Sequence, residues 1–348
     1  MGRLVGLLVL ILLLSVLAAC ATPSSIVTPT GVAIGTQPPP IATPTPAAPS
    51  PAPSPISVTP TPVPAPLATP APPPPTPVPT PMPTPEPTPP PVDAAWSGLQ
   101  RDLQAMVGRW EGQNAVSVTD LQSGRTISIN GSRPQLAACT IKIPLLMIVA
   151  QDIEAGRYSA DSVDSLVRSA MGPSNTWPAR ELLRTVGDGD IGAGIERVDD
   201  LMWSLGMNDS LLAHPPGYDW EDYGYGDAEN LLTTDDLNRL LGKLYRGEAL
   251  SPWATGYVLW SMSLAPDWVN ASLGGPLPAD VTLYHKFGQL YDPENTWNDA
   301  GIVVFERDGQ EYAYAIAYLG SYGGDWRVAY DHAYAVSARA WRYFDARY

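Results

Sequence analysis

The sequence predicts an α+β fold in which an antiparallel sheet is flanked by helices and an all-helical lobe is inserted between its strands. Alternation of apolar and polar residues, which is typical of strands, is found at 115–129 and again at 281–319. The residues between about 160 and 262 lack this alternation and show helical runs instead. Strands at both ends of a helical block indicate one sheet with an inserted lobe.

The first elements form a helix, a hairpin and a buried helix. We expect a helix at Trp96–Arg109, followed by strands at Ala115–Thr119 and Thr126–Ile129. Gln122–Gly124 lies between these strands and favours a tight turn, so the two strands are expected to pair. Ile141–Ala155 is apolar nearly all round, which predicts a helix buried on every side.

The later elements alternate between lobe and sheet. Helical runs predict two of the lobe helices, and alternating residues predict three further strands before a closing amphipathic helix. These segments are Glu196–Leu205 and Thr234–Tyr245 in the lobe, the strands Val281–Lys286, Gly301–Phe305 and Tyr312–Leu319, and the last helix Ala329–Phe344.

The N-terminus, residues 1–20, has the features of a secretory signal. A basic start at Arg3 is followed by the apolar run Leu4–Leu17 and the small residues Ala18 and Ala19 before Cys20. Leu-Ala-Ala-Cys resembles the lipobox of bacterial lipoproteins, which implies a lipid on Cys20 and an extracytoplasmic protein held at the cell membrane. An uncleaved anchor or an ordinary signal peptide is the alternative, although the run is short for a span of about 20 residues.

Residues 21–92 form a proline-rich linker. Of the 40 prolines in the chain, 29 fall between residues 23 and 91, and the only charged residue of the segment is Glu86. Such a segment cannot bury enough apolar surface to fold, and it favours polyproline II at about 3.1 Å per residue. We interpret it as a disordered spacer between the membrane and the domain at 93–348; a docking peptide for proline-binding modules is the alternative.

The composition argues against nucleic acid as a partner and against a metal as a cofactor. The chain has 35 acidic and 20 basic residues, a net charge of −15, and no cluster of Lys and Arg of the kind that binds nucleic acid. His214 and His332 are too isolated to form a metal site, and no zinc spacing is present, so no metal or other cofactor is expected. If Cys20 carries lipid, Cys139 has no disulfide partner.

Two of the three lysines of the chain lie in sequences that suggest chemistry. Lys142 follows Cys139 by three residues at the start of the predicted buried helix, and this spacing places both side chains on one helical face. Lys286 lies in His285-Lys-Phe-Gly288 at the end of a predicted strand. A thiol beside an ammonium group at a helix N-terminus is expected to have a lowered pKa.

These motifs, together with Pro173-Ser174-Asn175, resemble those of the class A β-lactamases and penicillin-binding proteins, the active-site-serine hydrolases. That family has Ser-x-x-Lys at a helix start, Ser-x-Asn in the helical lobe, and Lys-Thr-Gly or Lys-Ser-Gly on a strand. The resemblance extends over residues 96–348 and includes Leu201–Asn208 and the segment that begins at Leu232. It implies a β-lactamase/transpeptidase-like fold and acyl transfer on β-lactams or D-alanyl peptidoglycan stems.

The resemblance also implies residue roles. The Cys139 side chain is the expected nucleophile, and its amide and that of Gln289 are expected to form the oxyanion hole. The remaining expected roles are Lys142 as base or electrostatic activator, Asn175 as substrate-amide contact, Lys286 as carboxylate anchor, and Ser174 and Gly288 as substrate-binding residues.

Three positions depart from the family's motifs. Cys139 replaces the nucleophilic serine, Pro173 replaces the serine that relays a proton to the leaving nitrogen, and Phe287 replaces a hydroxyl that holds the substrate carboxylate while also narrowing the cleft. Glu221 is the nearest candidate for a deacylating acid. We therefore expect weak or lost hydrolysis, with a non-catalytic module that binds cell wall or a partner protein as the alternative.

Two other interpretations of Cys139 remain open. The thiol can be a small buried hydrophobic group in a site that has lost its activity. It can also be the nucleophile of a papain-like hydrolase, because His285 follows it by 146 residues and Asn295 and Asn298 come soon after. Against the second interpretation, Cys-Thr-Ile-Lys lacks the local signature of that family.

Overall fold

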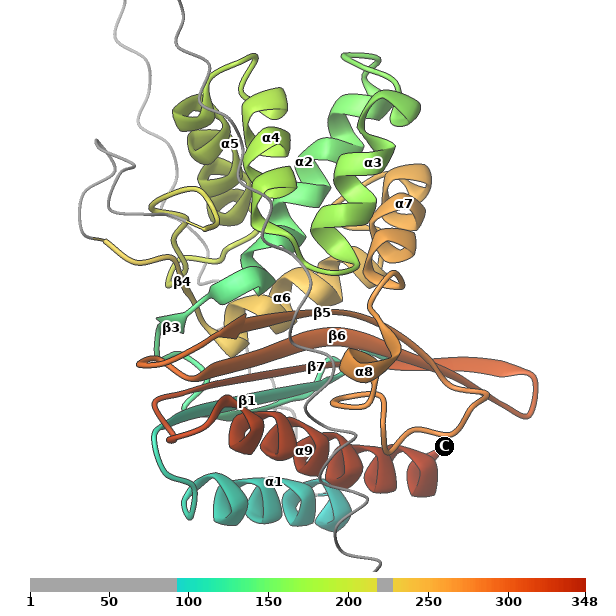
Figure 1. The fold of residues 1–348 in the computed structure, drawn as a ribbon. Helices are drawn as coiled ribbons and strands as arrows, with labels where there is room; N and C mark the ends of the chain where they lie inside the picture. Colours follow the sequence, from blue (N-terminus) through green and yellow to red (C-terminus); the bar gives the residue numbers. More distant parts are fainter. Residues whose placement is uncertain (1–92, 218–227) are drawn as a thin grey trace, which may run out of the picture. The chain divides into compact units, whose positions relative to one another are not determined.

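A five-stranded antiparallel sheet in the order β2-β1-β7-β6-β5 forms the middle layer of the domain (Figure 1). Both ends of the domain contribute to it, since β1 pairs with β2 on one side and with β7 on the other. The strands are β1 (Gln113–Asp120), β2 (Thr126–Ile129), β5 (Thr282–Leu290), β6 (Thr296–Arg307) and β7 (Gln310–Ser321). The antiparallel sheet that the sequence predicts is confirmed.

In this computed structural model, residues 93–217 and 228–348 are described. The predicted signal peptide with Cys20, the predicted linker and Glu221 lie outside these residues. Within the described ranges, no helix is both long enough and apolar enough to cross a membrane.

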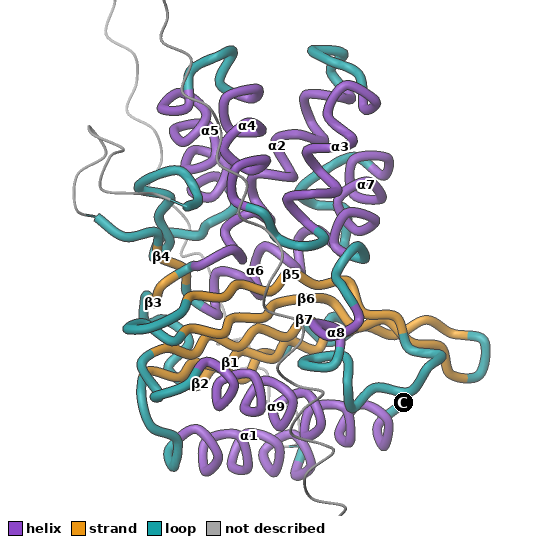
Figure 2. The backbone as a smooth tube through the Cα atoms, viewed as in Figure 1, coloured by secondary structure: helices purple, strands orange, loops and turns teal. Residues whose placement is uncertain are grey.

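Helices cover both faces of the sheet, as Figure 2 shows in purple. The first and last helices, α1 (Ala94–Val107) and α9 (Trp326–Arg347), pack on one face. The other face carries the helical lobe, with α6 lying against the sheet. The lobe helices are α2 (Lys142–Glu154), α3 (Ala160–Met171), α4 (Thr176–Val186), α5 (Ile191–Ser204), α6 (Thr234–Tyr245) and α7 (Pro252–Met262).

Strand β7 separates the two hydrophobic cores. Its odd-numbered residues from Ala313 to Leu319 belong to the lobe-side core, and three of these four are alanines, which let α6 approach closely. Its even-numbered Tyr314, Ile316 and Tyr318 belong to the core under α1 and α9. Because side chains alternate across a strand, this 12-residue strand contributes residues to both cores.

The structure extends and corrects the predicted elements. Helix α6 has the predicted bounds, but β5 continues to Leu290, so Lys286 lies within the strand and not at its end. Among the elements that were not predicted are the short strands β3 (Gln135–Leu136) and β4 (Leu231–Leu232), which pair with each other, and the one-turn helix α8 (Asp267–Asn270). Segments of two to four residues carry too little periodicity to be recognised in the sequence.

Candidate active site

Cys139 lies in a 3₁₀ turn, Ala138–Ile141, that leads directly into α2. The turn begins with Ala138 at a φ of 43°, a left-handed conformation that a non-glycine residue adopts at a cost. The side chain of Asn298 on β6 holds this turn, because its Nδ2 donates to the carbonyls of Leu136 (2.7 Å) and Ala137 (3.1 Å). Asn298 is therefore a positioning residue for the thiol, a role that no sequence pattern indicated.

Gly288 allows β5 to lie against this turn. A Cβ at Gly288 would be only 2.6 Å from the Cys139 amide nitrogen, so a larger residue cannot occupy the position. The first hydrogen bond of the turn runs from Thr140 N–H to Ala137 O, and the Cys139 N–H precedes it, as expected for an amide at a helix start. The backbone at 288–289 is thus close to the Cys139 amide, as the predicted oxyanion hole with Gln289 requires.

The Lys142 ammonium is buried and held by carbonyl oxygens. Its Nζ donates to the carbonyls of Ser174 (2.7 Å), Asn175 (3.0 Å) and Ala170 (3.4 Å). Carbonyls only accept, so three such partners match the three protons of an ammonium better than the two of a neutral amine. The geometry favours Lys142 as an electrostatic activator of the thiol over a general base.

Ser174 connects the two lysines. Its Oγ accepts a hydrogen bond from Lys286 Nζ at 2.7 Å and lies 3.4 Å from Lys142 Nζ. The φ of Ser174 is 67°, and this left-handed backbone turns its side chain toward the lysines while the neighbouring Pro173 is exposed. The prediction that the site loses this hydroxyl at Pro173 is therefore wrong, because Ser174 supplies a hydroxyl between the lysines.

Asn175 contributes to the site through its backbone. Its carbonyl accepts from Lys142, whereas its side-chain amide is exposed and donates to Ser169 Oγ at 2.9 Å. The amide lines a surface pocket of about 530 Å³ that also includes Thr176 and Trp177. In this position it can meet a substrate, but among the described residues it forms no hydrogen bond with the thiol.

Lys286 is buried under the ring of Phe287. The Lys286 Nζ lies 4.0 Å from the ring centroid and also donates to the Phe287 carbonyl at 2.8 Å. The Phe287 ring is 3% exposed and packs against Trp268 and Trp297. The expectation that Phe287 narrows the cleft is not met, because its ring is part of the aromatic core and shields the ammonium from solvent.

The electrostatics of the site favour a reactive thiol. Burial by itself raises the pKa of Cys139, but the charges of Lys142 and Lys286 more than offset it, so that the pKa is lowered overall. Burial lowers the pKa of Lys142, and burial together with the Lys142 charge lowers the pKa of Lys286 to about 7. The Cys139 Sγ donates to the Ser174 carbonyl at 3.8 Å and so shares an acceptor with Lys142.

The papain-like interpretation is wrong. Both ring nitrogens of His285 have other partners: Nδ1 pairs with Asp299 Oδ1 and Nε2 with Asn270 Oδ1, each at 2.7 Å. His285 neighbours Lys286 on β5, so the two side chains point to opposite faces of the sheet. Asn295 hydrogen bonds to Asp292 in a turn and also takes no part in a site with the thiol.

No group of three or more His, Cys, Asp or Glu in the described ranges could hold a metal ion. The polar groups that the described residues bring together at the site are the Cys139 thiol, the ammonium groups of Lys142 and Lys286, and the Ser174 hydroxyl.

The fold is similar to that of known proteins. The model of the β-lactamase enzyme family matches residues 98–185 and 162–344. A β-lactamase from Sphaerobacter thermophilus DSM 20745 has 21% sequence identity and a TM-score of 0.60, covering 71% of this chain and 96% of that one. A β-lactamase from Chitinophaga pinensis DSM 2588 has 20% identity and a TM-score of 0.60, covering 72% and 100%.

A mutant of PBP-A, described as an acyl-enzyme complex with penicillin G, has 21% identity and a TM-score of 0.58, covering 72% of this chain and 97% of that chain. No curated protein matches the sequence. At these identities the structural similarity establishes the fold.

Proposed function

The chain belongs to the β-lactamase enzyme family, and from this premise we propose that the domain is an extracytoplasmic acyl-transfer protein that uses the thiol of Cys139. The proposed substrates are β-lactams or D-alanyl peptidoglycan stems. The observation that carries the proposal is that the Ser174 hydroxyl lies between two buried ammonium groups, while the carbonyl of the same residue accepts a hydrogen bond from the thiol.

The first step needs no separate base. The charges of Lys142 and Lys286 lower the pKa of Cys139, which favours the thiolate, the nucleophilic form. Its sulfur attacks the substrate carbonyl carbon, a C–S bond forms, and the negative charge moves to the carbonyl oxygen. The backbone amides of Cys139 and Gln289 are the proposed donors to that oxygen.

The leaving nitrogen receives its proton through Ser174. When the C–N bond breaks, the Ser174 hydroxyl gives its proton to the nitrogen and takes one from Lys286, whose Nζ already donates to it at 2.7 Å. A lysine with a pKa of about 7 can hold and release this proton near neutral pH. The products are a thioester on Cys139, a neutral amine that carries the transferred proton, and a neutral Lys286.

Hydrolysis of the thioester is proposed to be slow. It needs a water molecule activated by a positioned base, and the ammonium of Lys142 is already occupied by three carbonyls. The proposed activity is therefore acylation with weak turnover.

Intact mass of the full chain after incubation with penicillin G tests the proposal. Ring opening keeps both fragments attached, so we expect one adduct with the mass of the whole penicillin molecule, absent from Cys139→Ala. Ser174→Ala should form the adduct about 10² to 10⁴ times more slowly because its proton donor is lost. A wild-type chain without an adduct, or a Cys139→Ala chain that still carries one, would contradict the proposal.

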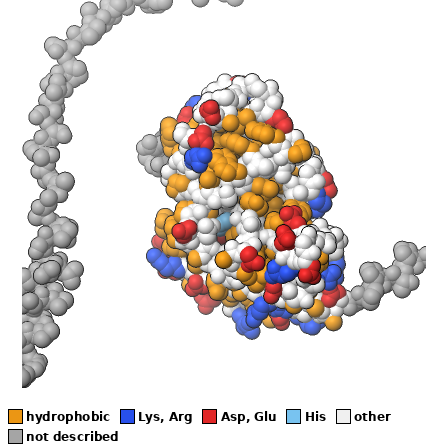
Figure 3. Space-filling view, turned by 90° about the vertical axis from the view of Figure 1, so that its right-hand side faces the viewer, with side chains coloured by type: hydrophobic (Ala, Val, Ile, Leu, Met, Phe, Trp, Pro, Cys, Tyr) orange, Lys and Arg blue, Asp and Glu red, His pale blue; other side chains and the backbone are white. Residues whose placement is uncertain are grey.

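A non-catalytic binding module is the second candidate. Hydrophobic side chains gather on the face that carries α7 and α8 (Figure 3), where Trp253 is 47% and Trp268 51% exposed. Exposed aromatic side chains in such a group favour a binding surface. This candidate gains support if penicillin G leaves Cys139 unmodified while the folded chain still binds purified cell wall in a pull-down assay.

We also propose that the domain is attached to the membrane by a lipid on Cys20, with residues 21–92 as a spacer. The lipobox-like Leu17-Ala-Ala-Cys20 sequence supports this proposal. Cys20→Ala should release the protein from the membrane fraction or leave it unprocessed, as measured by fractionation and immunoblotting. A variant that stays in the membrane fraction with a normally cleaved N-terminus would contradict the lipid anchor.

A further inference from the structure

A second cavity lies at the end of the sheet opposite β5, between the β1–β2 hairpin and α6. Its volume is about 630 Å³, enough for a small organic ligand. None of the residues proposed for acyl transfer lines it. Polar and charged side chains line it from both sides: Gln122, Ser123 and Ser128 from the hairpin, and Asp235, Asn238 and Lys243 from α6.

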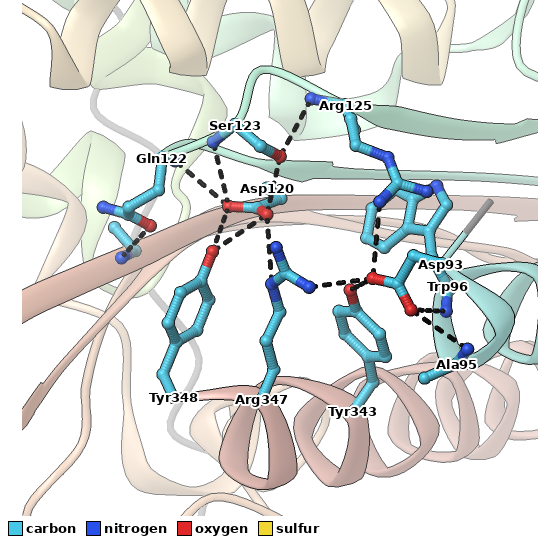
Figure 4. A network of polar contacts seen from close by, with 11 residues as sticks. Asp93, Ala95, Trp96, Asp120, Gln122, Ser123, Arg125, Tyr343, Arg347 and Tyr348 are labelled. Atoms are coloured by element: carbon cyan, nitrogen blue, oxygen red, sulfur yellow. Dashed lines mark hydrogen bonds and ion pairs between the residues drawn. The ribbon is translucent and has the colours of Figure 1, made fainter. Parts of the chain in front are cut away.

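The hairpin wall of this cavity is held in place by a polar network (Figure 4). The buried carboxylate of Asp120 accepts from the Ser123 hydroxyl (2.7 Å), from the Gln122 amide (3.1 Å) and from the hydroxyl of Tyr348 at the end of α9. The Gln122 side chain in turn accepts from the Ala313 N–H on β7. The turn that faces the cavity is thus pre-organised, which lowers the entropy that a ligand must offset.

The helical wall carries one unneutralised cation. Arg239, Lys243 and Arg246 follow one face of α6 at spacings of four and three residues. Arg239 pairs with Asp236, and Arg246 pairs with Glu248. Lys243 forms no ion pair or side-chain hydrogen bond with the described residues, so its charge is available to an anionic group.

The other end of the cavity accepts hydrogen bonds. Asp235 is eight residues before Lys243, about 12 Å along the helix, and its carboxylate already accepts from the Ser117 and Ser128 hydroxyls. On the cavity lining, Asn238 is 3% exposed, and its Nδ2 donates to Thr119 and to the Ala315 carbonyl. Because that carbonyl can only accept, the amide orientation is fixed, and Asn238 Oδ1 is a buried acceptor without a partner in the described ranges.

We propose that this cavity binds an acidic saccharide, whose hydroxyls donate to Asp235 and the Asn238 end and whose carboxylate or phosphate pairs with Lys243. A neutral sugar would leave the Lys243 ammonium without a counter-charge. A small anion without hydroxyls would be repelled by Asp235 and could not donate to Asp235 or to Asn238 Oδ1. The two kinds of group, at opposite ends of a single cavity, therefore select a ligand that carries both.

Isothermal titration of the full chain tests this proposal with four probes: glucose 6-phosphate, glucuronate, glucose and inorganic phosphate. We expect saturable binding of glucose 6-phosphate or glucuronate, at least tenfold tighter than binding of glucose or of phosphate alone. The preferred acid shows whether the cavity selects a phosphate or a carboxylate.

Lys243→Gln should weaken binding of the acidic sugars at least tenfold, because it removes the one cation of the described cavity lining that forms no ion pair. Ser128→Ala should weaken binding of all the sugar probes, because it removes the hydroxyl that positions the Asp235 carboxylate. Arg109→Gln, which removes an exposed cation outside the cavity, is the matched control and should bind like wild type.

Circular dichroism checks that each variant is folded. The proposal is overturned if wild type binds none of the sugars, if Lys243→Gln binds the acidic sugars as well as wild type does, or if inorganic phosphate binds as tightly as glucose 6-phosphate. The last result would indicate an adventitious ion only.

Discussion

The two faces of the central sheet differ in what they bury. On the face under α1 and α9, β7 presents tyrosines and an isoleucine, and the core around Trp297 consists of packed rings. On the lobe face, β7 presents alanines, and two fully buried lysines lie close by at the start of α2 and on β5.

The difference shows how one sheet can separate stability from chemistry. Burial of aromatic rings stabilises the folded state, although the buried Tyr314 hydroxyl on this face has no hydrogen-bond partner in the described ranges. On the lobe face each buried ammonium carries a larger desolvation cost, which its hydrogen bonds offset. Strained backbone at Ala138 and Ser174 lies on the reactive side as well. We therefore expect the α1/α9 face to stabilise the folded state and the buried charges and strained backbone of the active-site face to reduce that stability.

Loss of a central ring should have the largest effect. Trp297 is fully buried, stacks on Phe287 and Trp326, and donates to the Ser272 hydroxyl. Trp297→Ala should lower the free energy of unfolding by about 3–5 kcal/mol, measured by urea denaturation. A loss below about 1 kcal/mol would contradict the assignment of stability to this face.

Overpacking tests the lobe face. Ala315 lies in the alanine row of β7 that faces α6, so Ala315→Leu should cost about 1–3 kcal/mol by forcing the helix away. Ala346→Leu, at an exposed position of α9, is the matched control and should change stability by less than about 0.5 kcal/mol. If the two substitutions changed the free energy of unfolding equally, the packing between β7 and α6 would not be tight, and the prediction would be wrong.

The buried lysine predicts a particular pH dependence of stability. The pKa of Lys286 is lowered to about 7 in the folded state, so above pH 7 the unfolded chain binds more protons there than the folded one. Stability should therefore rise with pH from about 7 toward 10, by about 1–2 kcal/mol between pH 7 and 9 for this group. Below pH 7 both states hold the proton and this contribution stays constant.

Urea denaturation at pH 7 and pH 9 measures this contribution when wild type is compared with Lys286→Met. The variant should lack the rise that Lys286 causes, although the thiol of Cys139, whose pKa is also lowered, adds a smaller rise of the same sign to both proteins. The interpretation fails if both proteins show the same increase.

The smallest effect is expected on the reactivity of the Cys139 thiol. Cys139 should react with iodoacetamide with an apparent pKa below that of an ordinary thiol, about 8.5, and Lys142→Met should raise that pKa because the lysine charge that lowers it is lost. The rate of alkylation as a function of pH gives both values. A thiol that reacts only after denaturation would instead favour a buried hydrophobic role for Cys139.

The sequence by itself determined the α+β order of elements, since periods of 2 and 3.6 residues are local properties that do not depend on tertiary contacts. It also placed Cys139 and Lys142 together, because their spacing of three residues spans less than one helical turn. The sequence motifs likewise led to Lys286 and Gly288, which the structure brings beside that turn.

Only the tertiary structure decided which hydroxyl meets the lysines, where the Phe287 ring lies and what His285 contacts. The Ser174–Lys286 hydrogen bond joins residues 112 positions apart, and it depends on a left-handed backbone at Ser174 that the neighbouring residues do not reveal. The position of the Phe287 ring depends on its stacking against Trp297, and that of the His285 ring on its hydrogen bond with Asp299. The contacts of these side chains are made between segments that are distant in the sequence, whereas a sequence motif fixes only the position of a residue along the chain.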